Sequence, residues 1–516
     1  MQQPDTSSTS RRQAPPASAP GRGFALALAA MVLVVLLLRL NLVFRLNVNW
    51  DEFYFLHHVY AYLRGELVAP LQTFHVHFLT WLPGVAQNEV DQIVAARLVI
   101  FVLLVASTAL TYLIARAILD RAAAAFSVLC YLTLSYAVEH GTSFRADPIA
   151  SFLFLASLAL LVKGAGSIAG AAGSGLVAAA AVMITIKSVF YLPVLGVVLL
   201  AGLLDREEWR RSLWRILAFA AAFLASLAAL YLLHAASLAE PTLEATGRQA
   251  GASASKVIML DNLFPRWRYL VRTLIHDMAI WLMLLLGAVY LAVELFRARP
   301  WPSRRALLLL SFLLPLGTLA FYRNAFPYYY VFLLTPAAIV CGVVFQRLLP
   351  SREAARSKLS YGIALLLVVA VSLGFARSYL ENAENRTAEQ RKTVALVHEI
   401  FPEPVAYIGR TTTVTSFRHV GFFMSTWGLE IYRARGTPMF RDLIIEEEPL
   451  FLLATRAQLD LETDQGPYRE SGYALFEEDY RVLQNNYVHH WGDLYLAGKT
   501  LPVSYTHLTL PTIYSV

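Results

Sequence analysis

Eleven apolar runs limit the folds that are open to this chain. They are residues 24–44, 93–115, 122–138, 149–162, 168–186, 189–204, 213–236, 274–295, 306–321, 329–348 and 359–378. About 20 helical residues cross a bilayer, and a backbone in lipid must satisfy its own hydrogen bonds. We therefore expect an all-α polytopic membrane protein with about eleven spans. The short runs 149–162 and 189–204 are expected to be tilted, or broken where they line a cavity.

Composition supports a membrane protein and argues against a nucleic-acid partner. The chain is 57% hydrophobic and 15% charged, whereas soluble domains are about 45–50% apolar and about 25% charged. The net charge is +7, but the Lys and Arg residues cluster in short loops between apolar runs, a pattern typical of membrane orientation. Cys130 and Cys341 lie inside apolar runs, so we interpret them as small core residues.

The positions of the basic residues predict the orientation of the spans. If the N-terminus is cytoplasmic, the cytoplasmic loops contain Arg116, Arg121, Lys163, Arg206, Arg210, Arg211, Arg215, Arg297, Arg299, Arg304, Arg305, Arg347, Arg352, Arg356 and Lys358. This arrangement satisfies the positive-inside rule along the whole chain. The loops 45–92, 139–148 and 237–273 are then expected on the outer side of the membrane, together with the C-terminal portion.

Composition also divides the chain into segments. Residues 1–23 are rich in Ser, Pro, Gln and Arg, which predicts a disordered cytoplasmic N-terminus. Residues 24–378 form the membrane domain, and its first run is too long for a signal-peptide core, so we expect a retained span. Residues 379–503 mix helix-like and strand-like stretches, which predicts a small α/β domain. Residues 504–516 break this trend and are interpreted as a non-native tail.

Two adjacent acids follow the first apolar run, in the stretch "NVNWDEFYF". Asp51 and Glu52 open an amphipathic helix, where acids favour the first turn. They also stand beside the membrane, where a rigidly held carboxylate would meet a lipid-linked substrate. Capping and catalysis are compatible, and both interpretations stay open on these residues alone.

A second acid stands in the loop "SFRADP". Asp147 precedes Pro148, which suits the first turn of a helix, and Arg145 lies two residues earlier. One interpretation is a capping Asp beside a snorkelling Arg. The other is functional, because two acids and an Arg at one membrane boundary suit a phosphorylated lipid. The Arg would bind phosphate, and an acid would accept a proton.

Further candidates lie close to span ends. Lys187 in "TIKSVFYLP" and Arg323 in "FYRNAFPYYY" are candidates for a donor phosphate, although snorkelling is the ordinary role of such residues. Tyr328 and Tyr329 follow, and they belong either to the interfacial aromatic belt or to a sugar site. His75 and His77 form an H-x-H pair without a clear further ligand, so they are interpreted as substrate-binding residues. No metal site is indicated.

The ordered set of these motifs resembles the GT-C superfamily of polyprenyl-phosphate-sugar glycosyltransferases. The set comprises the "DE" after the first span, the long outer loop, "FRADP", the Lys-containing turn before "LP", and "PYYYVFLLTP". The chain looks most like the bacterial relatives of protein O-mannosyltransferases, which include aminoarabinose and rhizobial galacturonosyl transferases. The resemblance covers roughly residues 24 to 380. It implies a multi-pass protein of the bacterial cytoplasmic (inner) membrane.

The resemblance also implies roles for individual residues. Asp51 matches the essential acid of the first outer loop, followed by Glu52, and Asp147 matches the acid of the second. Arg145 matches the basic residue near that acid, and Lys187 matches the lysine that often lies beside the donor phosphate. The implied donor is a polyprenyl-phosphate-linked sugar, no cofactor is indicated, and the acceptor is a glycolipid, polysaccharide or protein. A protein acceptor is in doubt, because no large domain lies between the spans.

The rival interpretation is a multi-span transporter or flippase of a lipid-linked glycan. Transporters usually place ionisable groups near the bilayer midplane and contain internal repeats. In this chain the acids stand at the outer boundary, and the middles of the runs hold almost none. The large outer loops also favour a glycosyltransferase.

Overall fold

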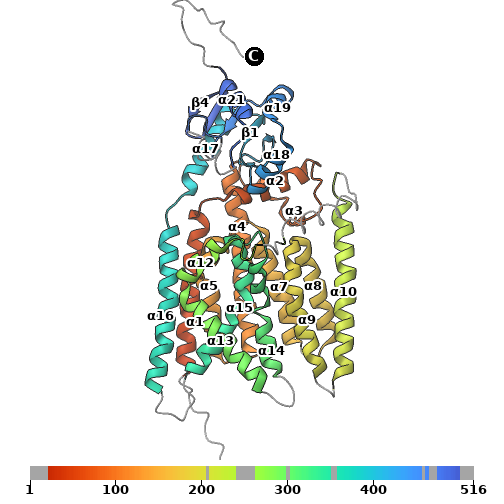
Figure 1. Ribbon diagram of the computed structural model, residues 1–516, viewed down its shortest axis with the longest axis vertical. Coiled ribbons are helices and arrows are strands. Elements are labelled where there is room, and N and C mark those ends of the chain that lie inside the picture. The colour runs from red at the N-terminus through yellow and green to blue at the C-terminus, as the bar shows by residue number, and fades with distance from the viewer. Residues whose placement is uncertain are drawn as a thin grey trace, which may run out of the picture.

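The computed structural model describes residues 21–164, 166–204, 208–239, 258, 262–297, 303–349, 357–455, 459–463 and 473–499. Most of the expected N-terminal segment 1–23, much of the loop 237–273 and the expected tail 504–516 lie outside the described residues. Figure 1 shows an upright bundle of helices with a smaller domain at one end.

Long apolar helices build the bundle. Within the described residues, eight segments are long and apolar enough to cross a membrane: Gly23–Arg45 in α1 (Gly21–Arg45), α4 (Glu89–Arg116), α7 (Ala146–Lys163), Ile186–Leu204 (η2, Ile186–Tyr191; α9, Leu192–Leu200; η3, Ala201–Leu204), α10 (Trp209–Ala235), α13 (Met278–Arg297), α15 (Pro327–Leu348) and Leu359–Ile400, which joins α16 (Ser357–Asn382) to α17 (Thr387–Ile400). The predicted class, an all-α polytopic membrane protein, is confirmed.

Three of the eleven expected spans are not among these eight segments. The run 122–138 divides into α5 (Arg121–Thr133) and α6 (Ser135–His140), and 168–186 forms the 17-residue α8 (Ile168–Ile184). The run 306–321 divides into α14 (Arg304–Ser311) and η4 (Leu314–Ala320). At the α5–α6 break the Asp277 carboxylate accepts hydrogen bonds from the backbone N and Oγ of Ser135, at 3.0 and 2.7 Å. A buried acid thus satisfies the backbone where the helix is interrupted.

Small residues and aromatic rings set the packing of the bundle. A Cβ on Gly175 of α8 would lie 2.4 Å from the backbone oxygen of Phe219 in α10, so only glycine permits this approach. The buried α15 packs against α5, α6, α7 and α13, and the rings of Phe126 and Phe345 stack with centroids 4.0 Å apart. The bundle is therefore close-packed around α15.

Short helices cover the end of the bundle that faces the smaller domain. They are α2 (Trp50–Leu63), α3 (Val76–Leu79) and η1 (Leu82–Gly84), while α12 (Trp267–His276) precedes α13. Figure 1 shows α2 and α3 between the bundle and the C-terminal domain. Asp51 and Glu52, in the first turn of α2, therefore lie where the two parts of the molecule meet.

The C-terminal domain is a small α/β unit, as predicted. Its elements after α17 are β1 (Ala406–Gly409), β2 (Arg418–Val420), α18 (Thr426–Arg435), α19 (Phe440–Glu447), β3 (Phe451–Leu453), α21 (Glu477–Asn486), β4 (Tyr487–Trp491) and β5 (Leu494–Ala497). The sheet has the order β2-β1-β3-β5-β4, with β1 parallel to β2 and β3, and β5 antiparallel to its neighbours.

The domain is anchored directly on α2. Thr411 and Thr412 donate through their hydroxyls to the backbone oxygens of Trp50 and Phe53, both at 3.2 Å. The ring of Phe423 stacks on Tyr54 with centroids 4.8 Å apart. The C-terminal domain therefore helps to fix the helix that carries Asp51 and Glu52.

Candidate active site

A capping box fixes the first turn of α2. The side chain of Asn49 accepts from the backbone N of Asp51 at 3.0 Å, and Glu52 Oε2 accepts from the backbone N of Asn49 at 2.9 Å. These bonds satisfy donors that a helix start leaves without intrahelical partners. The backbone under Asp51 and Glu52 is therefore held rigidly.

Glu52 points inward and is completely buried. It accepts from Arg97 Nε at 2.8 Å, from Arg97 Nη2 at 2.5 Å and from the backbone N of Phe144 at 2.7 Å. Burial opposes its ionisation, but Arg97 and the hydrogen bonds outweigh burial and hold the pKa of Glu52 below its ordinary value. Glu52 thus ties α2 to α4 and to the loop before α7.

Asp51 points toward a different set of charges. Arg145, the N-cap residue of α7, pairs with Asp51 and also lies 3.7 Å from Oδ2 of Asp147. Lys187 Nζ lies 2.5 Å from Oδ1 of Asp147. The guanidinium of Arg145 sits over the ring of Tyr328, 3.6 Å from its centroid. The structure therefore brings five of the predicted site residues together, and we call these five the charged cluster.

Exposure differs between the two acids of the charged cluster. The side chain of Asp51 is 22% exposed, and that of Asp147 is 3% exposed. Burial lowers the pKa of Arg145, but Asp51, Tyr328 and Asp147 together raise it above its ordinary value, so Arg145 stays charged. Asp51 is the carboxylate that an incoming molecule can reach, while Asp147 holds the two cations in place.

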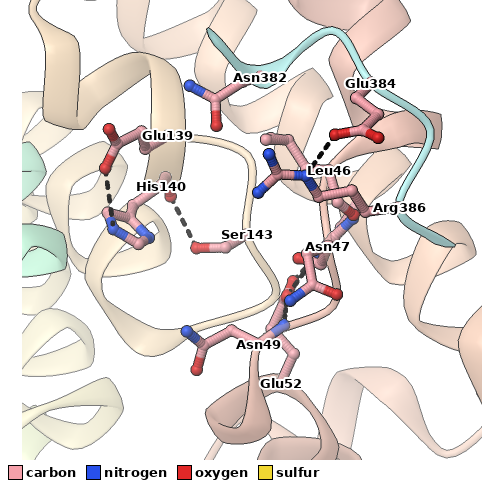
Figure 2. A pocket seen from close by; sticks show the side chains of 11 residues that line it. Leu46, Asn47, Asn49, Glu52, Glu139, His140, Ser143, Asn382, Glu384 and Arg386 are labelled. Atoms are coloured by element: carbon pink, nitrogen blue, oxygen red, sulfur yellow. Dashed lines mark hydrogen bonds and ion pairs between the residues drawn. The ribbon is translucent and has the colours of Figure 1, made fainter. Parts of the chain in front are cut away.

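A polar cavity of about 160 Å³ opens on the far side of the α2 cap. It is lined by Leu46, Asn47, Asn49, Glu52, Arg97, Glu139, His140, Ser143, Asn382, Glu384 and Arg386. Figure 2 shows Glu139, His140 and Ser143 on one side of it, and Asn47 and Arg386 on the other. Burial, and then the charge of Arg145, lower the pKa of His140 to about 3, so this ring is neutral.

A second, apolar cavity of about 290 Å³ lies below the α2–α3 layer. Its walls are Phe74, His75, Phe78, Leu79, Ala96, Val99, Ile100, Leu103, Phe144, Ile149, Phe152, Leu153, Ala180 and Ile184. They come from α3 and the two residues before it, from α4, α7 and α8, and from the loop residue Phe144, which directly precedes Arg145. The apolar cavity therefore reaches from the membrane helices toward the charged cluster.

The remaining predicted residues lie apart from the charged cluster or at its margin. His75 is buried, with Nε2 3.3 Å from the backbone oxygen of Phe55, and His77 Nε2 lies 2.8 Å from Nδ1 of His234. The hydroxyl of Tyr329 lies 2.8 Å from that of Thr318. No group of three or more His, Cys, Asp or Glu suited to a metal occurs within the described residues.

Arg323 faces the C-terminal domain. Its Nη2 lies 2.6 Å from Oε1 of Glu430, and its guanidinium lies 4.4 Å from the ring centroid of Trp427. Both partners belong to α18, so the structure gives Arg323 a docking contact.

Two residues of the site were not found from the sequence. Arg97 holds Glu52 and also donates to the backbone oxygens of Leu46 and Asn47, at 2.7 and 2.9 Å. It stands inside the apolar run 93–115, where a charged residue is rare and usually functional; this signal was available. Phe423 of the C-terminal domain stacks on Tyr54. The two residues are far apart in the sequence, so no local sequence pattern predicts this contact.

Comparisons with known proteins are informative at the level of the fold. No family model and no curated protein matches the chain. Among solved structures, the oligosaccharyltransferase of Archaeoglobus fulgidus in the apo form aligns with a TM-score of 0.59 at 12% identity, over 90% of this chain and 73% of that one. Archaeal AglB, in complex with an inhibitory peptide and a dolichol-phosphate, gives 0.57 at 12% identity, over 94% and 76%.

A bacterial structure is also similar. ArnT from Cupriavidus metallidurans, bound to undecaprenyl phosphate, aligns with a TM-score of 0.57 at 16% identity, over 84% of this chain and 93% of that one. These structures belong to the GT-C superfamily. The predicted resemblance is confirmed at the level of architecture: this multi-pass membrane protein has the GT-C fold.

Proposed function

We propose that this protein is a glycosyltransferase that moves a sugar from a polyprenyl-phosphate donor to an acceptor of the cell envelope. The observation that supports this most is the charged cluster. A partly exposed carboxylate, Asp51, pairs with Arg145, and a second acid, Asp147, contacts both Arg145 and Lys187. This arrangement offers a base for the acceptor and positive charge for the leaving phosphate.

The proposed reaction is a direct displacement at the anomeric carbon of the donor sugar. The acceptor oxygen forms a bond to this carbon while the bond from the carbon to the phosphate oxygen breaks. Asp51 takes the proton of the acceptor hydroxyl. The electron pair of the broken bond leaves on the polyprenyl phosphate, and the transition state resembles an oxocarbenium ion. Arg145 and Lys187 stabilise the growing charge of the leaving phosphate.

The apolar cavity supplies a place for the beginning of the prenyl chain. It is lined by helices of the bundle and by Phe144, one residue before Arg145. A prenyl phosphate bound there would place its tail among apolar side chains and its headgroup at the charged cluster. The similar ArnT structure contains undecaprenyl phosphate, and the AglB structure contains dolichol-phosphate, which favours this class of donor.

We further propose that the reaction takes place on the outer side of the bacterial cytoplasmic membrane. The distribution of Arg and Lys along the sequence favours a cytoplasmic N-terminus. Figure 1 places α2 and the C-terminal domain at one end of the bundle. In this orientation the charged cluster opens away from the cytoplasm.

The test is a mass-spectrometric comparison of envelope glycans and lipids from cells with and without the protein. We expect one component to lose a hexose, pentose or uronic acid. The wild type should restore the sugar, and Asp51→Asn should fail to do so. Asp91→Asn is the matched control, because Asp91 is an Asp at the same end of the bundle that pairs with Arg391. Unchanged glycoconjugates together with altered uptake of a solute would instead indicate a transporter.

A further inference from the structure

A third cavity, of about 280 Å³, lies between α2 and the C-terminal domain; we call it the interdomain cavity. It is lined by Asn47, Val48, Asn49, Trp50, Phe53, Glu389, Gln390, Thr393, Arg410, Thr411, Thr413, Thr455 and Asp493. It shares Asn47 and Asn49 with the polar cavity. Asp51 follows directly after Trp50, so the interdomain cavity adjoins the residue that we propose as the base.

The lining of the interdomain cavity is rich in neutral hydrogen-bonding groups. Four threonines and two asparagines contribute hydroxyls and amides, and Trp50 and Phe53 contribute rings. The amide of Gln390 already bonds the backbone of Val48, and the hydroxyl of Thr411 already donates to the backbone of Trp50. Thr411 and Thr413 are only 4% and 6% exposed, so their side chains belong to the enclosed walls. Hydroxyls and amides both donate and accept hydrogen bonds. This combination with aromatic surface suits a molecule that carries many hydroxyl groups.

The charges around this cavity disfavour an anionic molecule. Arg410, its basic residue, lies 3.8 Å from the ring centroid of Trp50 and donates from Nε to the backbone oxygen of Met424 at 3.2 Å. The lining also includes Glu389 and Asp493, and Glu389 pairs with Lys392 at 3.3 Å. With this pair counted, the acids and bases balance, so a phosphate or uronate bound here would meet no excess of positive charge.

The polar cavity on the other side of Asn47 and Asn49 has the same character. Its two basic residues are paired with acids: Arg97 with Glu52 at 2.5 Å, and Arg386 with Glu384 at 3.1 Å. In the charged cluster Arg145 and Lys187 are also paired with acids, but they share Asp147, so the two cations lie close together. A departing phosphate would meet both cations there.

We propose that the acceptor is an uncharged glycan, and that the interdomain cavity binds it. This inference rests on the proposed function and narrows its acceptor class. A sugar residue held against Trp50 presents one hydroxyl to Asp51, which takes the proton as the oxygen bonds to the anomeric carbon of the donor. The polyprenyl phosphate leaves with the electron pair of the broken bond.

The chemical class of the acceptor can be tested with the purified full-length protein. Envelope extracts from cells that lack the protein are separated by anion exchange into a neutral and an anionic pool. Each pool is incubated with radiolabelled polyprenyl-phosphate sugars from the same cells. We expect label in the neutral pool. Label confined to the anionic pool would overturn the neutral-acceptor inference and keep the proposed function. Label in neither pool, with the donor intact, would contradict the proposed function itself.

The location of the acceptor can be tested with two isosteric substitutions. Thr413→Val removes a hydroxyl from the wall of the interdomain cavity. Thr415→Val is the control, because Thr415 is buried outside this wall and its Oγ1 makes no hydrogen bond within the described part of the chain. Loss of one hydrogen bond should raise KM for the neutral pool about three- to tenfold in Thr413→Val. The KM for the donor should stay unchanged in Thr413→Val. In the control Thr415→Val, the KM values for the donor and for the neutral pool should both stay unchanged.

Two outcomes would assign the cavity differently. An increase in KM for the donor instead of the acceptor in Thr413→Val would place the donor sugar in the interdomain cavity. Equal acceptor KM values for Thr413→Val, Thr415→Val and the wild type would exclude Thr413 from acceptor binding. Thr413→Trp, which fills the cavity, should then be measured as well, and undiminished transfer by this variant would overturn the inference.

Discussion

The two sides of the first turn of α2 hold adjacent acids in opposite environments. On the inner side Glu52 is fully buried, and it meets Arg97 and the backbone of Phe144. On the other side Asp51 is 22% exposed, and it meets Arg145 of the charged cluster. Neighbouring residues on a helix point about 100° apart, so one turn can serve both a packed interior and an open site.

This difference teaches that partners and burial, and not residue type, separate a structural acid from a candidate base. The carboxylate of Glu52 is fully engaged in contacts that join α2 to α4 and to the loop before α7. We propose that the buried contacts of Glu52 fix the first turn of α2, and that this keeps the reactive oxygen of Asp51 accessible. Three predictions test this division, and they run from the largest expected effect to the smallest.

Glu52→Gln should destabilise the protein strongly. The change leaves Arg97 charged and buried without a carboxylate, and breaking a buried pair in this way costs about 3–5 kcal/mol. Thermal unfolding in detergent measures the effect. The control Asp91→Asn breaks a more exposed pair, with side chains 44% and 31% exposed, and should cost about 0–1 kcal/mol.

The double variant Glu52→Gln/Arg97→Met separates two contributions to the loss of stability. One is the cost of a buried Arg97 without a carboxylate, and the other is the loss of the remaining contacts of Glu52. The double variant removes the uncompensated charge, so it should recover part of the stability that Glu52→Gln loses. If Glu52→Gln unfolds at the same temperature as Asp91→Asn, the structural role of Glu52 is wrong.

Lys187→Met should weaken transfer and lower stability in part, because it leaves the buried carboxylate of Asp147 with Arg145 at 3.7 Å. Transfer is therefore measured on the folded fraction. Lys187 lies at the charged cluster with a side chain 11% exposed, and we propose that it contacts the donor phosphate. Loss of a hydrogen bond to a charged group is worth about 1.5–3 kcal/mol, so kcat/KM for the donor should fall about 10- to 100-fold. Arg481→Gln, an exposed change in the C-terminal domain, is the control. A normal kcat/KM in Lys187→Met would remove Lys187 from the site.

Mild acid should loosen the layer under α2. Burial lowers the pKa of His75 to about 4, while an unfolded His titrates near about 6.5. The unfolded chain therefore binds more protons between these values, so this stability is complete above about pH 6.5 and is lost as the pH falls toward 4. At pH 5 the loss is about 2 kcal/mol. Melting temperatures of the wild type and His75→Phe at pH 7.5 and 5 measure it, and equal pH dependence would contradict the prediction.

Much of the fold could be predicted from the sequence because lipid imposes one requirement on every span. The apolar runs and the polar C-terminal segment therefore sufficed for the fold class. The charged cluster was also accessible, because Asp51, Arg145, Asp147 and Lys187 all stand next to span ends. Topology alone brings such positions to one level of the membrane.

The rest depends on contacts between distant segments. Thr411 and Thr412 are separated from their partners on α2 by about 360 residues, and local periodicity carries no information about such pairs. The break between α5 and α6 depends on Asp277, which lies 142 residues away. The different burial of Asp51 and Glu52 could not be predicted for a related reason: it is set by α4 and by the loop before α7.

The most direct test of the division between Asp51 and Glu52 is the single-turnover rate of sugar transfer by Asp51→Asn with bound polyprenyl-phosphate donor. Loss of a general base should lower this rate about 10²- to 10⁴-fold, while the melting temperature stays at that of the wild type because Asp51 is partly exposed. A rate within threefold of the wild type, measured on folded Asp51→Asn, would show that Asp51 is not the base.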